Sequence, residues 1–138
     1  MNFFDMMGVS ASGLTAQRTR METIATNLAN AQTTRTASGE PYRRKDVVFR
    51  TKEPPTFQQE LDSALQGVEV AEVVQDKSDF QVRYEPGNPD ADENGNVKYP
   101  NVDSMVEMAN LVSATRSYEA NLTVIEATKQ LMLGTLEI

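Results

Sequence analysis

The sequence contains no cysteine, no histidine and no tryptophan in 138 residues. Without cysteine the chain has no disulfide and no thiol nucleophile, and without histidine it lacks the usual imidazole base and zinc ligand. It also has no serine followed three residues later by lysine, and no glycine-rich phosphate-binding loop. These absences argue against an enzyme, and we expect no catalytic residue, no cofactor and no small-molecule substrate.

Large apolar residues are scarce as well. Leu, Ile, Val and Phe make up about 22% of the chain, just above the roughly 20% below which disorder is the default. No apolar run approaches the roughly 20 residues of a membrane span, and the first residues lack a basic start followed by an apolar block. We expect one small domain, either cytosolic or exported without a cleaved signal peptide.

The net charge of −7 argues against a nucleic-acid partner, whose phosphates require a basic surface. Residues 1–52 carry a charge of +4 and residues 53–138 a charge of −11. This asymmetry is compatible with head-to-tail contacts between subunits and equally with uneven sampling in a short chain. The basic run Arg43, Arg44 and Lys45 is followed at once by Asp46, so we interpret it as a solvated or interface patch.

Proline divides the chain into three parts. All six prolines fall between residues 41 and 100, which leaves both ends free of the strongest helix breaker. The sequence predicts a terminal helix over 1–31, a linker with a small β and loop segment over 32–100, and a second terminal helix over 101–138. The expected fold is mainly α, with long N- and C-terminal helices pairing as a coiled coil and a small β-hairpin in the loop-rich middle.

Both ends carry apolar residues at heptad spacing. The first stripe consists of Met7, Leu14, Met21 and Leu28, with Ile24 and Ala31 interleaved. The second, interrupted at Thr115 and Lys129, consists of Met108, Leu111, Tyr118, Leu122, Ile125, Met132 and Leu136. Asn101 and Asp103 are candidate N-cap residues, and Glu107 lies where a capping acid belongs. Because each stripe is narrow, we expect the helices to find partners in other chains; packing on the chain's own domain is the alternative.

The middle of the chain combines short strands with turns. Residues 46–50, 68–74 and 80–84 are rich in valine and aromatic residues, and a turn at 76–79 predicts a hairpin between the last two. Phe57, Leu61 and Leu65 recur at helical spacing and predict a short helix. Residues 32–45 show no periodicity and are expected to form a mobile link.

One stretch resembles the opening of a calcium loop. Asp90, Asp92 and Asn94 supply oxygens at alternate positions before Gly95, but Asn101 stands where the closing glutamate belongs and nearby prolines exclude flanking helices. We interpret the stretch as a solvated acidic turn with a tight Asn94–Gly95 hairpin geometry. A small calcium-binding module using Asp90, Asp92 and Asn94 is the alternative function.

The two ends also carry a family resemblance. Residues 12–33, SGLTAQRTRMETIATNLANAQT, resemble the N-terminal signature of bacterial flagellar rod and hook proteins, with Asn27 and Asn30 in matching places. Residues 99–121 resemble the C-terminal signature at Asn101, Val102, Asp103, Glu107, Met108, Arg116, Tyr118, Glu119 and Asn121. The short chain and residues 84–103 are most similar to the proximal rod members of the family.

The resemblance implies a structural axial subunit of the basal-body rod. Its terminal helices would form a coiled coil in the inner tube, its middle would face outward, and the assembly would serve as drive shaft and export channel. The implied partners are the chain itself, other rod proteins, the flagellar type III export apparatus and the membrane-embedded ring. The implied location is the rod crossing the periplasm, reached by export without a cleaved signal peptide.

The predicted assembly interface combines both stripes with three asparagines. Asn27 and Asn30, one helical turn apart, are interpreted as hydrogen-bonding to adjacent subunits and fixing register; helix C-capping by Asn30 is an equal alternative. The predicted interface residues are Met7, Leu14, Met21, Ile24, Asn27, Leu28, Asn30, Met108, Leu111, Tyr118, Asn121, Leu122, Ile125 and Met132.

Overall fold

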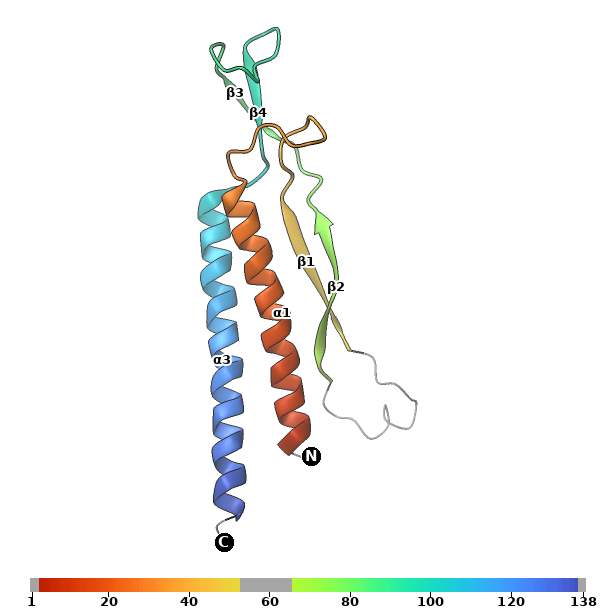
Figure 1. Ribbon diagram of the computed structural model, residues 1–138, viewed down its shortest axis with the longest axis vertical. Helices are drawn as coiled ribbons and strands as arrows, with labels where there is room; N and C mark the ends of the chain where they lie inside the picture. The colour runs from red at the N-terminus through yellow and green to blue at the C-terminus, as the bar shows by residue number, and fades with distance from the viewer. Residues whose placement is uncertain (1–2, 53–65, 137–138) are drawn as a thin grey trace.

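The computed structural model describes residues 3–52 and 66–136 as an elongated molecule built on two long helices (Figure 1). Helix α1 spans Phe3–Ala29 and helix α3 spans Ser104–Leu136. They lie side by side and run in opposite directions, so both ends of the chain emerge at the same end of the helix pair (Figure 1). In the described part of the chain, neither helix is long and apolar enough to cross a bilayer.

Side-chain caps explain two of the helix boundaries. Asp103 Oδ1 accepts hydrogen bonds from the backbone N–H groups of Met105 (2.9 Å) and Val106 (3.3 Å), which confirms Asp103 as the N-cap of α3. At the end of α1, Asn30 Nδ2 donates to the carbonyl of Thr26 (2.9 Å) and satisfies one of the last helical acceptors. The capping interpretation of Asn30 is therefore supported.

The contact between α1 and α3 combines small and polar residues with half-buried apolar ones, since Leu111, Tyr118, Ile125 and Met132 alternate along α3 with Glu107, Ala114, Asn121 and Thr128. The most buried residues recur at spacings of three and eight on α1 and of seven and fourteen on α3, which place them on one face of each helix. They are Ser10, Gly13, Ala16, Ile24 and Asn27 on α1, and Glu107, Ala114 and Thr128 on α3. Among the predicted apolar stripe residues only Ile24 is fully buried. The seam within the chain thus uses part of the predicted stripes, with Met21 near Thr115, while Met108 and Leu122 stay exposed.

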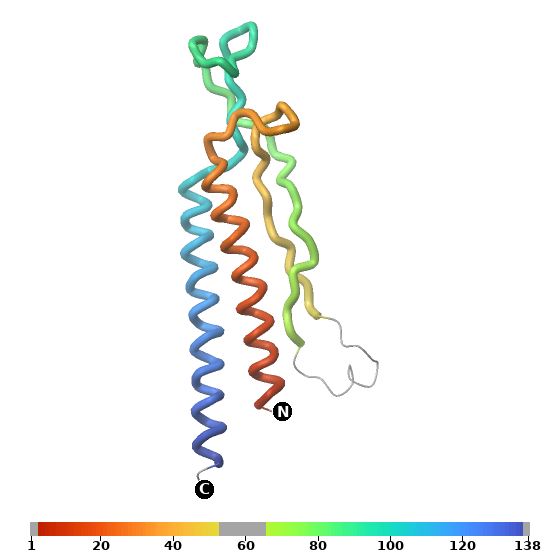
Figure 2. Tube along the Cα trace, viewed as in Figure 1, coloured from red at the N-terminus to blue at the C-terminus, as the bar shows by residue number. Residues whose placement is uncertain are grey.

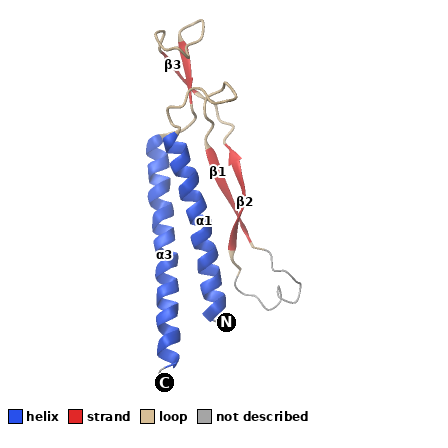
Figure 3. Ribbon diagram, viewed as in Figure 1, coloured by secondary structure: helices blue, strands red, loops and turns tan. Residues whose placement is uncertain are grey.

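The middle of the chain forms two separate antiparallel sheets of two strands each (Figure 3). Strand β1 (Lys45–Thr51) pairs with β2 (Val68–Gln75), with Val47 opposite Val73 and an irregularity between Val48 and Phe49. Both strands contact α1, and among the described residues α1 thus lies between this hairpin and α3, as the chain trace shows (Figure 2). The helix expected around Phe57, Leu61 and Leu65 lies outside the described residues.

Strands β3 (Gln81–Tyr84) and β4 (Asn96–Tyr99) pair with each other at the end of the molecule opposite the termini (Figure 1). The expected hairpin between residues 68–74 and 80–84 is therefore wrong. Ser78 N–H donates to Asp76 Oδ1 (2.9 Å), and the Asp76 carbonyl accepts from Asn101 (3.0 Å). These bonds hold the turn against the start of α3, so the chain leaves β2 in a new direction instead of folding back on it.

Strand β4 was not anticipated, although its turn was. Gly95 adopts a positive φ of 78°, which a glycine tolerates without strain, and its carbonyl accepts from Glu85 N–H (2.8 Å). The Asn94–Gly95 pair thus ends a turn whose Gly95 N–H donates to the Asp92 carbonyl (2.9 Å), but the expected tight hairpin is wrong, because residues 85–95 form a long connection between β3 and β4. Four alternating residues after it were too few to identify a strand from sequence.

Residues 32–44, expected to lie in a mobile link, contain no helix or strand but are anchored by hydrogen bonds. Tyr42 N–H donates to the Thr33 carbonyl (3.0 Å), which folds the segment into a closed loop. The Tyr42 ring is buried against the ends of the helices. This loop therefore brings β1 to the point where α1 ends and α3 begins.

Candidate functional site

A buried polar cluster lies where the end of α1, the start of β1 and the start of α3 meet. We call it the polar junction; its members are Asn27, Tyr42, Arg44, Asn101 and Glu107. Asn27 and Glu107 are both 0% exposed. Because buried polar groups are costly unless they are hydrogen-bonded, each member requires partners at this position.

Asn27 uses every hydrogen-bonding position of its amide. Its Nδ2 donates to the Lys45 carbonyl (2.8 Å) and to Glu107 Oε2 (2.9 Å). Its Oδ1 accepts from Lys45 N–H (2.9 Å) and from the Tyr42 hydroxyl (2.9 Å). By bonding both backbone groups of Lys45, the side chain acts as a neighbouring strand would and closes the free edge at the start of β1.

Glu107 is a buried carboxylate paired with a guanidinium. Arg44 Nε donates to Glu107 Oε1 (2.8 Å), and Arg44 Nη1 lies 3.1 Å from Asp46 and 3.6 Å from Asp76. Burial opposes the charge of Arg44, but hydrogen bonds to Glu107 and Asp46 outweigh burial and raise its pKa. Burial, together with the nearby Glu107 charge, also raises the pKa of the Tyr42 hydroxyl. The neutral hydroxyl therefore remains a donor to Asn27.

Asn101 connects the junction to the turn after β2. Its Oδ1 accepts from Arg44 N–H (2.8 Å), and its Nδ2 donates to the carbonyl of Asp76 (3.0 Å) and to Ser78 Oγ (2.9 Å). Hydrogen bonds from Ser78 lower the pKa of Asp76, and the charges of Arg44 and Arg43 act in the same direction. The start of α3 is thus tied to both ends of the first hairpin.

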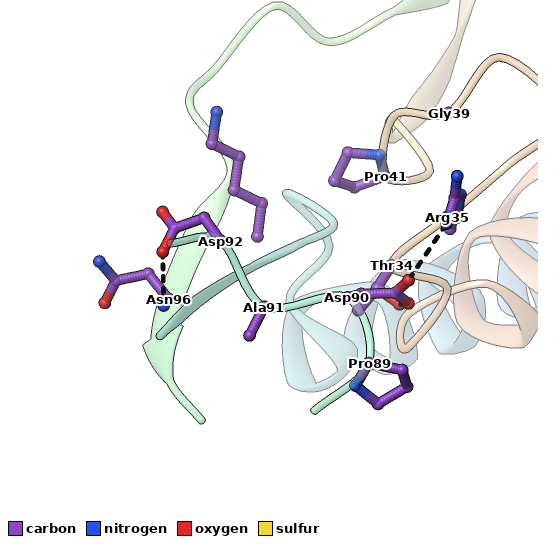
Figure 4. A pocket seen from close by; sticks show the side chains of 10 residues that line it. Thr34, Arg35, Gly39, Pro41, Pro89, Asp90, Ala91, Asp92 and Asn96 are labelled. Carbon is purple, nitrogen blue, oxygen red and sulfur yellow. Dashed lines mark hydrogen bonds and ion pairs between the residues drawn. The ribbon is translucent and has the colours of Figure 1, made fainter. Parts of the chain in front are cut away.

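Two carboxylate oxygens of the acidic turn that resembles a calcium loop accept hydrogen bonds from protein donors. Asp90 Oδ2 accepts from the Thr34 hydroxyl (2.7 Å), and Asp92 Oδ1 accepts from the N–H groups of Asn94 and Asn96 (2.9 Å each; Figure 4). Within residues 3–52 and 66–136, no group of three or more acidic side chains is placed to hold a metal ion. No observation favours the calcium-binding alternative.

A shallow pocket of about 320 Å³ lies beside this turn, between residues 34–41 and 89–98 (Figure 4). Its walls carry both signs of charge, with Arg35 on the segment 34–41 and Asp90, Asp92 and Lys98 on the segment 89–98. Arg35 and Asp90 lie 3.8 Å apart and partly neutralise each other. The pocket therefore offers no single charge or buried polar group that would select a ligand.

Large apolar side chains lie exposed along the helices. Met105 is 77% exposed and Leu136 is 80% exposed, at opposite ends of α3. Between them, exposed apolar residues recur on faces of α3 that do not contact α1: Val106, Met108, Val112, Leu122, Val124, Leu131 and Leu133. Exposed apolar surface of this extent is typical of a protein that assembles with others.

The structure places the predicted interface residues in three environments. Buried are Ile24 and Asn27; exposed are Met108 and Leu122; half-buried are Met7, Leu14, Met21, Leu28, Asn30, Leu111, Tyr118, Asn121, Ile125 and Met132. Their contacts with other subunits remain predictions. The bonds of Asn27 lie within its own chain, and Glu107 turns its side chain toward α1 instead of capping α3. Sequence reasoning missed Tyr42 and Arg44 as members of the junction, because nothing local indicates their partners.

Two paired terminal helices with exposed apolar faces are typical of a structural subunit of a larger assembly. Comparison with known proteins identifies the family of that subunit. Residues 7–35 match the family Flagella basal body rod protein, and residues 93–138 match the family Flagellar basal body rod FlgEFG protein C-terminal. These two stretches contain most of α1 and all of α3.

Whole-chain comparisons agree with the two family matches. The chain is 46% identical to the flagellar basal-body rod protein FlgC of Bacillus subtilis (strain 168), 45% to that of Salmonella typhimurium (strain LT2) and 41% to that of Borreliella burgdorferi. Each comparison covers 100% of this chain and 99%, 96% and 98% of the respective relative. The chain belongs to the FlgC family of flagellar basal-body rod proteins. It is a structural rod subunit of the flagellar basal body, and its relatives are structural proteins rather than enzymes.

Proposed function

We propose that the chain is an axial building block of the proximal rod, which joins neighbouring subunits through its terminal helices. In this proposal α1 and α3 form coiled-coil contacts with helices of adjacent rod proteins in the inner tube, and the hairpins face outward. The resulting tube serves as drive shaft and as export channel. One observation carries the proposal: large apolar side chains of α3 remain exposed on faces that α1 does not cover.

The energetics favour helical partners for these exposed residues. Full burial of a leucine or methionine side chain contributes roughly 1.5–3 kcal/mol, which the isolated chain does not gain at Met105, Leu131 or Leu136. Apolar residues repeated along a helix are buried best by another helix laid against them. A ring of copies would repeat each such contact, so the modest free energy contributed by each contact adds up around the rod.

Family membership supports further partners and a location. We infer that the chain assembles with copies of itself and with other rod proteins, and that it meets the flagellar type III export apparatus and the membrane-embedded ring. The rod would then cross the periplasm, and the chain would reach it by export without a cleaved signal peptide.

Substitution of Leu122 by aspartate tests the assembly contact. Leu122 is 41% exposed, so Leu122→Asp adds a solvated carboxylate in the free chain but a buried, unpaired one in the rod. We expect loss of motility and of rod assembly, with the exported subunit still detectable and its helix content unchanged. Leu122 is preferable to Ile125, which is half-buried.

Thr123→Asp is the matched control, since Thr123 is the exposed neighbour of Leu122 and points away from it around the helix. It should leave cells motile. Motile cells carrying Leu122→Asp would overturn the proposed contact. Loss of motility with Thr123→Asp alone would place the contact on a different face of α3.

A further inference from the structure

The seam between α1 and α3 has a repeating character that does not by itself define one alignment. The buried positions Ala114 and Thr128 are fourteen residues apart on α3, with half-buried Asn121 midway between them. Sliding α3 along α1 by seven residues, roughly 10 Å, would keep the heptad face of Leu111, Tyr118 and Ile125 against α1, at the cost of moving Asn121 away from Gly13. Heptad faces alone therefore specify the alignment of a helix pair only weakly.

The polar junction is the part of the seam whose hydrogen bonds form in one alignment only. Glu107 is fully buried and meets Asn27 (2.9 Å) and Arg44 (2.8 Å) in the observed alignment. A seven-residue shift would carry its carboxylate away from both partners. A buried carboxylate without partners is strongly disfavoured, and the amide of Asn27 would lose an acceptor in the same step.

The same residues tie the first hairpin to that alignment. Asn27 bonds both backbone groups of Lys45 at the start of β1, and Arg44 bonds Glu107 on α3. If the helices shifted, Asn27 could keep Lys45, but Arg44 would lose Glu107. The base of β1 can therefore satisfy all its partners in only one helix alignment.

We propose that Asn27 and Glu107 are positioning residues, which set the single register of α1 against α3 and dock the base of β1 in that register. Buried polar groups fix register in other helix pairs by the same physical means. This role depends only on contacts within one chain and is therefore independent of the proposed contacts between subunits.

The absence of cysteine in the sequence allows a direct measurement of register by disulfide cross-linking. Thr115 Oγ1 lies 3.6 Å from Met21 Sδ, so Met21→Cys with Thr115→Cys reports the observed register. Met21→Cys with Leu122→Cys, and Met21→Cys with Met108→Cys, report shifts of one heptad in the two directions. The purified full-length chain is oxidised at low concentration, and intramolecular cross-links are separated by gel mobility.

The first test replaces the junction with apolar residues. In each cysteine background we combine Asn27→Leu, Arg44→Met and Glu107→Leu, which removes the positive charge of Arg44 together with the negative charge of Glu107. We expect helix content to persist and the ratio of native to shifted cross-links to fall by roughly tenfold or more, as expected for losing charged hydrogen bonds. Amide exchange along β1 should accelerate. Exclusive native cross-linking in this variant would overturn the proposal.

Asn30→Leu is the control for the asparagine substitution. Asn30 lies one turn beyond Asn27, and its Nδ2 donates only to its own helix, at Thr26. This variant should keep the native cross-link and the exchange protection of β1. A shift of register in Asn30→Leu equal to that in the junction variant would also overturn the proposal, because register would then not depend on the junction.

A second test serves if the apolar variant loses its helices. Asn27→Asp places a carboxylate against Glu107 Oε2, and should lower the native cross-link. Adding Glu107→Gln returns an N–H donor opposite the new carboxylate and should restore part of the native cross-link, since the Lys45 carbonyl still lacks its donor. A general loss of stability would not be reversed by a second polar substitution at a buried site, so failure of this rescue contradicts the proposed positioning role.

Discussion

Gly13 of α1 faces Asn121 of α3 so closely that a Cβ atom at Gly13 would lie 2.9 Å from Asn121 Nδ2. Real Cβ atoms do not approach other heavy atoms at this distance, so a larger residue here would displace Asn121. Asn121 is itself held by a hydrogen bond from its Nδ2 to the Ser117 carbonyl (2.9 Å). The close approach of the two helices at this level therefore depends on the absence of a side chain at Gly13.

Gly13→Leu should destabilise the helix pair. Overpacking of a tight contact costs about 1–3 kcal/mol, and the gain in helix propensity over glycine offsets only part of this. The free energy of unfolding, measured by circular dichroism on the purified chain, should fall. Gly8→Leu is the matched control, because no atom lies within 4 Å of a Cβ at Gly8. Equal effects at the two glycines would contradict the close packing at Gly13.

Ionisation of Tyr42 should weaken the fold in alkali. Burial raises the pKa of Tyr42 above 10.0, so at pH values just above 10.0 the folded chain still holds a proton that the unfolded chain has lost. Stability from the neutral hydroxyl is therefore fully present below pH 10.0 and is lost as the pH rises through the folded pKa. The stability difference between the wild type and Tyr42→Phe should shrink over this range.

At neutral pH the Tyr42→Phe variant should be less stable by about 1 kcal/mol, since the hydroxyl bond to Asn27 is removed. Chemical denaturation of both proteins from pH 7 to pH 11.5 gives the comparison. A difference that stays constant across the whole range would show that Tyr42 does not titrate as its position requires.

Asp76 should contribute stability that disappears in acid. Hydrogen bonds from Ser78 lower the pKa of Asp76 below 3.8 in the folded chain. The contribution is therefore present above pH 3.8 and is lost as the pH falls through the lowered pKa. The difference in unfolding free energy between the wild type and Asp76→Ala should be larger at pH 6 than at pH 2. Asp79→Ala, at an exposed neighbour, should show a smaller difference at pH 6.

The combined Asp90→Ala and Asp92→Ala variant should still assemble and support near-normal motility. The loss of the two bonds to Asp92 Oδ1 should loosen the turn before β4, which lies beyond the start of α3 and at the opposite end of the molecule from Leu131, Leu133 and Leu136. Calcium should not change the thermal unfolding of the parent protein. Asp92→Asn, which keeps an acceptor oxygen, should retain more stability than Asp92→Ala. Loss of assembly in the double variant together with calcium-dependent stabilisation of the parent would instead indicate a metal site.

Much of the fold follows from local signals in the sequence. The distribution of proline predicts two terminal helices, and Asp103 marks the start of α3 because an N-cap acts within one helical turn. The Asn94–Gly95 pair predicts its turn for the same local reason. The strand pairing was less predictable, because the choice between partners depends on loops closed over many residues.

The seam and the junction show what local signals cannot provide. Apolar heptads indicate which faces tend to be buried, but not in which contact, and they do not reveal that Gly13 meets Asn121 across the pair. Glu107 has the position of a capping acid, and only the fold reveals that Asn27, 80 residues away, is its partner. The family signatures marked both residues without explaining them, since a signature preserves residue types and not contacts.

The docking of the first hairpin affects how the molecule resists bending. The hairpin of β1 and β2 is attached to α1 at Asn27 and also at Ser12, whose Oγ accepts a hydrogen bond from Val68 N–H (3.0 Å). These points are fifteen residues apart, about 22 Å along the helix. Over this length α1 is braced by α3 on one side and by the hairpin on the other, while the last turns of α3 extend beyond the start of α1 (Figure 1). The molecule should therefore resist bending most strongly between Ser12 and Asn27, and least at the end that carries the termini.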